Sequence, residues 1–238
     1  MLMIKEALPE NKQQEPKQQD GFQFFNDSYG LVLISIIIAI IITAALPETR
    51  WDFVLNVIIL GVTLQLAQWA SHEQPKTILI GTLALITSTI ITIIYARIGI
   101  DRFIWIPALI CTLLIAVTPI DIVRRLLTHK VVNTRTVLGA LCVFLLFGLF
   151  FAYLCATLGS LIRIPIFVQV KNPSLSDDLY FSYMTLTTVG YGDLTPGCGL
   201  MRALAVIEAL GGQLYLVTVV ALLVGNFGMS RGRHDADK

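Results

Sequence analysis

Two glycines at alternate positions, Gly190 and Gly192, mark the stretch of this sequence with the clearest potential for chemistry. They belong to the pentapeptide Thr188–Val189–Gly190–Tyr191–Gly192. An extended strand alternates the direction of successive residues, so aiming consecutive carbonyl groups at one axis requires a backbone that alternates its hand. Glycine adopts positive φ without steric cost, and Thr188 adds a hydroxyl oxygen. The pattern predicts a column of oxygens that could replace the hydration shell of a cation.

The pentapeptide needs partners outside its own strand. One strand cannot surround an ion, so we expect four copies of the chain around a shared axis, a homotetramer. The side chains of Val189 and Tyr191 would then point away from the axis, into packing that fixes the diameter of the ring.

A short helix is expected directly before the pentapeptide, over residues 177–187. Ser176, Asp177 and Asp178 offer a cap and negative charge at its N-terminus, where both are favourable. Its C-terminus would place partial negative charge near a cation. Irregular backbone at this depth of a membrane is permitted only where protein or water surrounds it, so the helix is expected to be re-entrant.

The composition places this segment in a membrane protein. Hydrophobic residues make up 55% of the 238 residues and charged residues 14%, against about 25% charged in a typical soluble domain. A membrane-spanning helix needs roughly 20 mostly apolar residues. The expected fold is an all-α membrane protein with six transmembrane helices and a re-entrant pore helix. The spans are expected at 29–46, 51–70, 77–95, 103–120, 136–158 and 200–227.

These spans divide the chain into five expected parts. Residues 1–28 form a cytoplasmic tail, 29–120 a four-helix sensor-like domain, 121–135 a cytoplasmic connector, 136–228 a pore domain and 229–238 a second cytoplasmic tail. Lys and Arg are more numerous in the loops on the side of the N-terminus. This bias predicts cytoplasmic termini in a protein of the plasma membrane.

The fourth span, 103–120, contains no charged residue, although Arg102 precedes it and Arg124 follows it. A voltage sensor needs charges within the membrane field, so conventional voltage gating is not expected. The connector that follows reads either as a short surface helix or, equally well, as a solvated basic loop. The apolar residues that would line one face of such a helix are Ile122, Val123, Leu126 and Leu127.

The last span carries two adjacent glycines at its middle, Gly211 and Gly212. Glycine weakens a helix locally, so the pair could form a gating hinge. Close packing of helices through small residues explains it equally well. Gln213, Leu216 and Val220 would line a cavity below the pentapeptide.

Glu208, one turn before Gly212, is an ionisable residue inside a span. Such a group costs roughly 2.5–3.5 kcal/mol at mid-bilayer on insertion scales and usually marks function. We expect it behind the pentapeptide, bonded to a hydroxyl of the short helix such as Ser182 or Thr185. A structural role and a gating role are both consistent with this position.

The stretch 136–227 resembles the pore domain of the potassium channel superfamily, in which an outer helix, pore helix, selectivity filter and inner helix follow one another. The same pentapeptide occurs in the selectivity filters of K⁺ channels, where rings of backbone carbonyl oxygens replace the hydration shell of the ion. The residues that follow it, Asp193-Leu194-Thr195-Pro196, continue the resemblance. The similarity is greatest to prokaryotic six-span channels with a weakly charged fourth segment. It implies a passive, tetrameric channel that holds K⁺ at Thr188, Val189, Gly190 and Tyr191 and needs no organic cofactor.

Two departures from that family affect the support of the filter. Many bacterial members place a glutamate in the pore helix, bonded to the aspartate after the filter; here the positions are Met184 and Asp193. Tyr180 and Phe181 stand where the family often has tryptophans and could still form an aromatic cuff. Thr187 completes the residues expected to support the filter.

Three other classes of function fit the sequence less well. A potassium transporter subunit would resemble four fused pore repeats, and a non-selective cation channel would usually break the Val-Gly-Tyr-Gly core. An enzyme is not expected, because His72, His129 and His234 are scattered and no nucleophile motif is present. A net charge of +1 gives no indication of nucleic-acid binding. Membrane lipid is the remaining expected partner, and no regulatory domain is expected after the pore.

Overall fold

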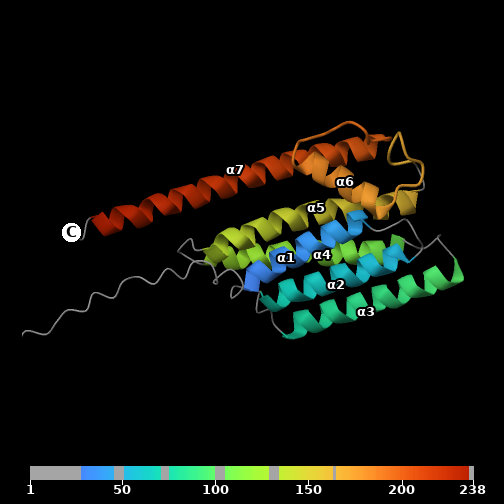
Figure 1. Ribbon diagram of the computed structural model, residues 1–238, viewed down its shortest axis with the longest axis horizontal. Helices are drawn as coiled ribbons and strands as arrows, with labels where there is room; N and C mark the ends of the chain where they lie inside the picture. Colours follow the sequence, from blue (N-terminus) through green and yellow to red (C-terminus); the bar gives the residue numbers. More distant parts are fainter. Residues whose placement is uncertain are drawn as a thin grey trace, which may run out of the picture.

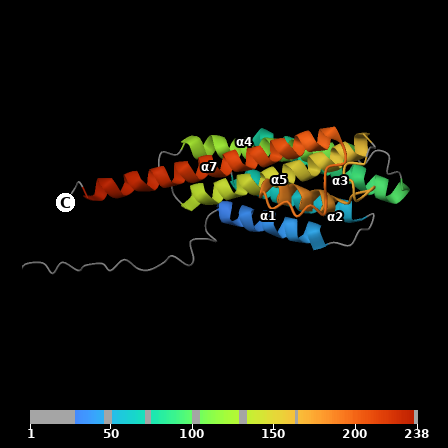
Figure 2. The same cartoon turned by 90° about the horizontal axis from the view of Figure 1, so that it is seen from above.

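A computed structural model describes the backbone of residues 28–45, 51–70, 75–99, 105–128, 134–162 and 165–235. The described chain consists of helices and connecting segments, with one isolated β-bridge between Phe167 and Pro196. Figure 1 shows the long helices running side by side, with the short α6 at one end of the molecule, and Figure 2 gives the same arrangement from above. The helices are α1 (Ser28–Ala45), α2 (Asp52–Ala70), α3 (Pro75–Ile98), α4 (Trp105–Thr128), α5 (Thr134–Ile162), α6 (Leu175–Leu186) and α7 (Gly199–Asp235).

Three of these helices contain segments long and apolar enough to cross a membrane. The segments are Ile78–Ile98, Thr136–Ile162 and Gly199–Val219. Three more helices contain shorter apolar segments, Tyr29–Ala45, Asp52–Gln68 and Trp105–Ile120. The described chain is therefore all-helical and consistent with the membrane protein expected from composition, and a helix lies at each place where the sequence predicts a span.

One helix boundary differs substantially from the sequence prediction. We expected the fourth span to end at residue 120 and a separate surface helix or loop to follow, but α4 continues through Pro119 to Thr128. Ile122 is fully buried, and with Ile115 it belongs to the main hydrophobic core. Burial of this side chain accounts for the continuation, because a surface helix would leave it exposed. The side chains of Leu126 and Leu127, and residues 129–133 of the expected connector, lie outside the described residues.

The main hydrophobic core joins the first helices to the pore region. It contains Ile36 of α1, Leu60 of α2, Cys111 of α4, Tyr153 of α5 and Leu179 of α6. The helix α4 packs along α5 of the same chain, and α1 contacts both α5 and α6. The four-helix part therefore packs directly against the helix that precedes the pentapeptide.

Polar side chains also connect neighbouring helices inside this apolar fold. Thr43 Oγ1 of α1 donates a hydrogen bond of 2.8 Å to Asn56 Oδ1 of α2. The hydroxyl groups of Thr112 in α4 and Thr157 in α5 lie 3.1 Å apart. Hydrogen bonds of this kind contribute to the association of helices in a membrane, where the apolar surroundings do not favour helix contact by themselves.

Candidate functional site

The helix α6 begins at a capping box that fixes its position. The N-cap is Ser174, whose hydroxyl accepts a hydrogen bond of 3.2 Å from the backbone N–H of Asp177, while the Asp177 carboxylate accepts one of 2.9 Å from the N–H of Ser174. Both contacts satisfy donors that the first turn of a helix leaves free. We expected the cap at Ser176, which instead lies inside the helix. The pattern Ser-x-x-Asp at positions 174 and 177 was the signal that sequence reasoning missed.

The backbone of the pentapeptide alternates its hand at every second residue. The φ angles are +60° at Thr188, +52° at Gly190 and +82° at Gly192. The two glycines take the conformation that the sequence analysis assigned to them. Thr188 does so too, although left-handed backbone is uncommon for a residue other than glycine. The conformation that directs consecutive carbonyl groups to one side therefore begins at Thr188, two residues before the first glycine of the pattern.

Main-chain hydrogen bonds attach the pentapeptide to α6. The carbonyl oxygen of Met184 accepts from the N–H groups of both Val189 and Gly190, at 3.0 and 3.1 Å, and the carbonyl of Thr185 accepts from the N–H of Thr188 at 3.0 Å. These N–H groups are directed to α6. The last turn of the helix therefore positions the pentapeptide through backbone atoms.

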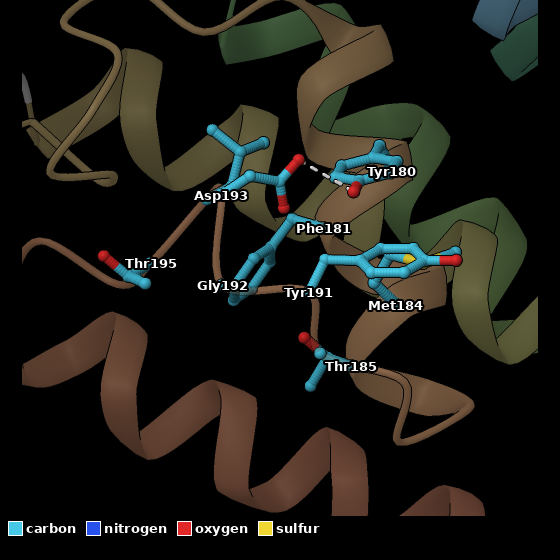
Figure 3. A pocket seen from close by; sticks show the side chains of 10 residues that line it. Tyr180, Phe181, Met184, Thr185, Tyr191, Gly192, Asp193 and Thr195 are labelled. Atoms are coloured by element: carbon cyan, nitrogen blue, oxygen red, sulfur yellow. Dashed lines mark hydrogen bonds between the residues drawn. The ribbon is translucent and has the colours of Figure 1, made fainter.

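The residue after the pentapeptide is held from the same helix. Tyr180 Oη donates a hydrogen bond of 2.8 Å to Asp193 Oδ2 (Figure 3). This bond raises the pKa of the Tyr180 phenol, because ionisation would place two negative groups in contact. Met184, at the position of the family's glutamate, lines a hollow that both of these residues also border. The tyrosine thus replaces the missing acid as the side chain that contacts the aspartate.

A clasp between two loops supports the end of the site that follows the pentapeptide. Gln169 Nε2 donates to Thr195 Oγ1, and Thr195 N–H donates to Gln169 Oε1, both at 2.9 Å. Phe167 packs on Phe181 of α6, with ring centroids 4.9 Å apart. A Cβ atom on Gly197 would lie 2.7 Å from the carbonyl oxygen of Pro165, so the two loops approach as closely as a glycine allows. No local sequence pattern predicts this clasp, because Gln169 and Thr195 are 26 positions apart.

The two glycines of α7 are sites of close packing, and the helix continues through both. A Cβ atom on Gly211 would lie 2.7 Å from the ring of Phe147, and one on Gly212 would lie 2.5 Å from Leu186 Cδ1 and 2.9 Å from its carbonyl oxygen. Gly212 therefore lets α7 approach the end of α6. This contact is a sufficient reason for glycine here, while the hinge stays a prediction.

Below the pentapeptide, α7 contributes one polar contact. Gln213 is exposed, and its Nε2 donates a hydrogen bond of 3.3 Å to Thr188 Oγ1. Leu216, one turn further, is half-buried. The side chain of Val220 lies outside the described residues. Of the side chains expected to line a cavity, Gln213 therefore lies at the Thr188 end of the pentapeptide.

Glu208 is buried between three helices. It is 1% exposed, and its Oε1 forms a hydrogen bond with Ser182 Oγ of α6, one of the two hydroxyl groups named from the sequence. Ser182 Oγ also lies 2.7 Å from the carbonyl oxygen of Gly148 in α5. In addition, Tyr183 Oη donates to the carbonyl of Leu145, at 2.6 Å. The buried acid thus takes part in a set of contacts that joins the outer, pore and inner helices.

This arrangement of two long helices, a capped half-length helix between them and a backbone of alternating hand is that of an ion-channel pore domain. The comparison with known families agrees, since residues 139–227 match a family model described as "Ion channel". The match supports a pore domain of the potassium channel superfamily over these residues.

Similarity to curated proteins is confined to a short stretch. Protein LctB from Bacillus caldotenax and protein LctB from Geobacillus stearothermophilus are each 48% identical to this chain over 50 residues. The stretch covers 21% of this chain and 37% of either relative. No solved structure matches the chain significantly.

Proposed function

We propose that four copies of this chain form a channel that conducts K⁺ selectively and passively across the plasma membrane. The observation that carries the proposal is the alternation of positive φ at Thr188, Gly190 and Gly192. Carbonyl oxygens directed at one axis replace the hydration shell of an ion, and K⁺ channels use rings of this kind. Thr188, Val189, Gly190 and Tyr191 would hold the permeant ion.

The exposure of side chains in the single chain supports the assembly. Tyr191 is 72% exposed and Val189 is 50% exposed, although both would point away from the axis of a filter. Large apolar side chains left open in this way mark a surface that another protein or the membrane covers, and these two lie in the pentapeptide and not on a long helix. Neighbouring copies around the axis would bury them.

Several finer features belong to the same proposal. We place both termini in the cytoplasm, so that Thr188 faces inward and Gly192 faces outward. We assign no voltage sensing to the first four helices, since α4 is uncharged through its membrane-spanning part. The gating hinge at Gly211 and Gly212 and the cavity lined by Gln213, Leu216 and Val220 are retained as parts of the proposal.

Ion flux into liposomes containing the purified full chain tests the proposal. We expect K⁺ influx to exceed Na⁺ influx by a large factor. We also expect the purified protein in detergent to sediment with the mass of a tetramer, after correction for bound detergent. Equal K⁺ and Na⁺ flux would instead identify a non-selective cation channel. Absence of flux from correctly assembled tetramers would contradict channel activity itself.

A further inference from the structure

The Ser182 hydroxyl lies between two oxygen atoms from different helices. The carbonyl oxygen of Gly148 in α5 is 2.7 Å away, and Glu208 Oε1 of α7 makes the second contact. The Ser182 and Glu208 side chains are 0% and 1% exposed, so bulk water does not supply an alternative partner. The hydroxyl is therefore positioned to donate to either oxygen.

A serine hydroxyl has a single proton, so it cannot donate to both oxygens at once. The Gly148 carbonyl can only accept. If Glu208 were a carboxylate, it too could only accept, and one of the two contacts would lack a hydrogen atom. If Glu208 is a carboxylic acid, it donates to Ser182, Ser182 donates to Gly148, and both contacts are hydrogen bonds.

The surroundings of Glu208 also disfavour a charged carboxylate. Among the described residues, the titratable groups that face it are the Cys155 thiol of α5 and the Tyr183 phenol of α6. Asp178 of α6 is also buried and acts on the same thiol. None of these groups is a cation, and Arg202 of α7 is exposed and lies more than a turn away. A buried carboxylate without a cationic partner is costly, whereas the neutral acid is not.

We propose that Glu208 is a neutral, proton-bearing acid in the assembled protein and that its proton completes a relay from α7 through Ser182 of α6 to the Gly148 carbonyl of α5. Loss of the proton removes one of the two hydrogen bonds and introduces a charge between the helices. The relay is thus a proton-binding site that joins the three helices of the pore domain.

The relay lies close to the atoms that hold the filter. Ser182 is two residues before Met184, whose carbonyl accepts from the N–H groups of Val189 and Gly190. Glu208 is one turn before Gly212, which packs against the end of α6. A shift of α6 relative to α7 on deprotonation would therefore move the filter. We infer that K⁺ conduction declines as the pH rises and Glu208 ionises.

Infrared spectroscopy tests the protonation state without requiring flux. The full chain in detergent or lipid at neutral pH is compared with the Glu208→Gln variant, in both unlabelled protein and protein with ¹³C-labelled glutamate carboxyl groups. We expect a carboxylic-acid C=O band that shifts with the label and is absent from the variant. Absence of any glutamic-acid band from the wild type at neutral pH would overturn the proposal, whatever the flux measurements give.

Flux as a function of pH tests the consequence, and this part rests on the proposed channel function. Wild-type K⁺ flux should fall roughly two- to tenfold at alkaline pH, the change that loss of one hydrogen bond can drive. Glu208→Gln should keep its flux across the range, because the amide still donates to Ser182 and cannot ionise. Asp178→Asn, which removes a neighbouring buried acid outside the relay, should decline as the wild type does.

The outcomes separate the two proposals. Equal K⁺ and Na⁺ flux would count against the channel proposal and leave the infrared result standing. A contrary outcome is selective K⁺ flux that stays constant as the pH is raised to the highest value at which the protein remains folded. That result would overturn the proposal that protonation of Glu208 regulates conduction. The same conclusion would follow if Glu208→Gln declined with pH as steeply as the wild type.

Discussion

Tyr180 Oη lies 2.8 Å from Asp193 Oδ2 and donates a hydrogen bond to it, so that α6 holds both ends of the candidate filter. At the inner end the holding atoms are backbone carbonyls of α6, whereas at the outer end the holding group is a tyrosine side chain. The two ends therefore differ in how a substitution can alter them. At the outer end, substitution of Tyr180 removes the contact between α6 and Asp193.

Removing the Tyr180 hydroxyl should weaken the outer end of the filter. In Tyr180→Phe, Asp193 loses its partner on α6, and we expect steady-state K⁺ flux to fall a few-fold through faster inactivation, with selectivity retained. Stopped-flow flux in liposomes, followed over time, measures the decay. Tyr183→Phe is the matched control, because it removes a tyrosine hydroxyl that bonds to Leu145 of α5 and not to the filter. An equal decay in both variants would refute a specific role of the Tyr180–Asp193 bond.

The same bond predicts a late titration of Tyr180. Asp193 raises the pKa of this phenol. The hydrogen bond therefore stabilises the folded protein fully at pH values below the pKa of an unfolded tyrosine, about 10. It is lost only as the pH rises through the higher folded value. Ultraviolet titration of tyrosinate should therefore show one fewer late-ionising group in Tyr180→Phe than in the wild type. An unchanged titration curve would contradict this assignment.

Substituting alanine for either glycine of the filter should abolish selective flux. Gly190 and Gly192 have positive φ, where a Cβ atom costs about 1–2 kcal/mol per residue. Neither Cβ atom would meet another atom of the same chain within 4 Å, so the expected defect is conformational. Gly199→Ala is the control, because it also meets open space but lies at the start of α7. Selective K⁺ flux from Gly190→Ala would rule out the carbonyl arrangement proposed here.

Alanine at Gly212 should destabilise the pore domain more than alanine at Gly211. The new Cβ atom at position 212 would meet a backbone oxygen of Leu186, which cannot rotate away, whereas at position 211 it would meet the side-chain ring of Phe147. Overpacking of this kind costs about 1–3 kcal/mol. Thermal unfolding of the two variants measures the difference. A Gly212→Ala protein as stable as the wild type but unable to gate would favour the hinge over packing.

Loss of the loop clasp should lower stability without altering selectivity. Gln169→Ala removes the side-chain hydrogen bonds to Thr195, each contributing about 0.5–1.5 kcal/mol. The midpoint of thermal unfolding should fall by several degrees, since about 1 kcal/mol corresponds to roughly 2–4 °C in a chain of this size. Lys171→Ala, an exposed substitution in the same loop, is the control. A K⁺ to Na⁺ flux ratio that falls with the melting temperature would show that the clasp acts on the filter itself.

Periodicity and composition predicted the helices well because long apolar runs in a membrane protein leave few alternatives. The alternating glycines predicted positive φ at Gly190 and Gly192 for a purely local steric reason. The predictions were wrong where distant packing decides: α4 extends past Pro119 because Ile122 is buried in the core. The clasp at Gln169 and the carbonyl partner of Ser182 were missed for the same reason, since residues far apart in sequence form them.

The double acceptor at Met184 makes part of the filter insensitive to side-chain mutation. Its carbonyl oxygen receives the N–H groups of Val189 and Gly190, and every amino acid at position 184 supplies the same oxygen. Sequence drift at this position can therefore alter the hollow behind the filter while the two hydrogen bonds persist. Replacing the amides of Val189 and Gly190 with ester linkages would delete the N–H donors. This change removes the two hydrogen bonds, which side-chain substitution at residue 184 leaves intact.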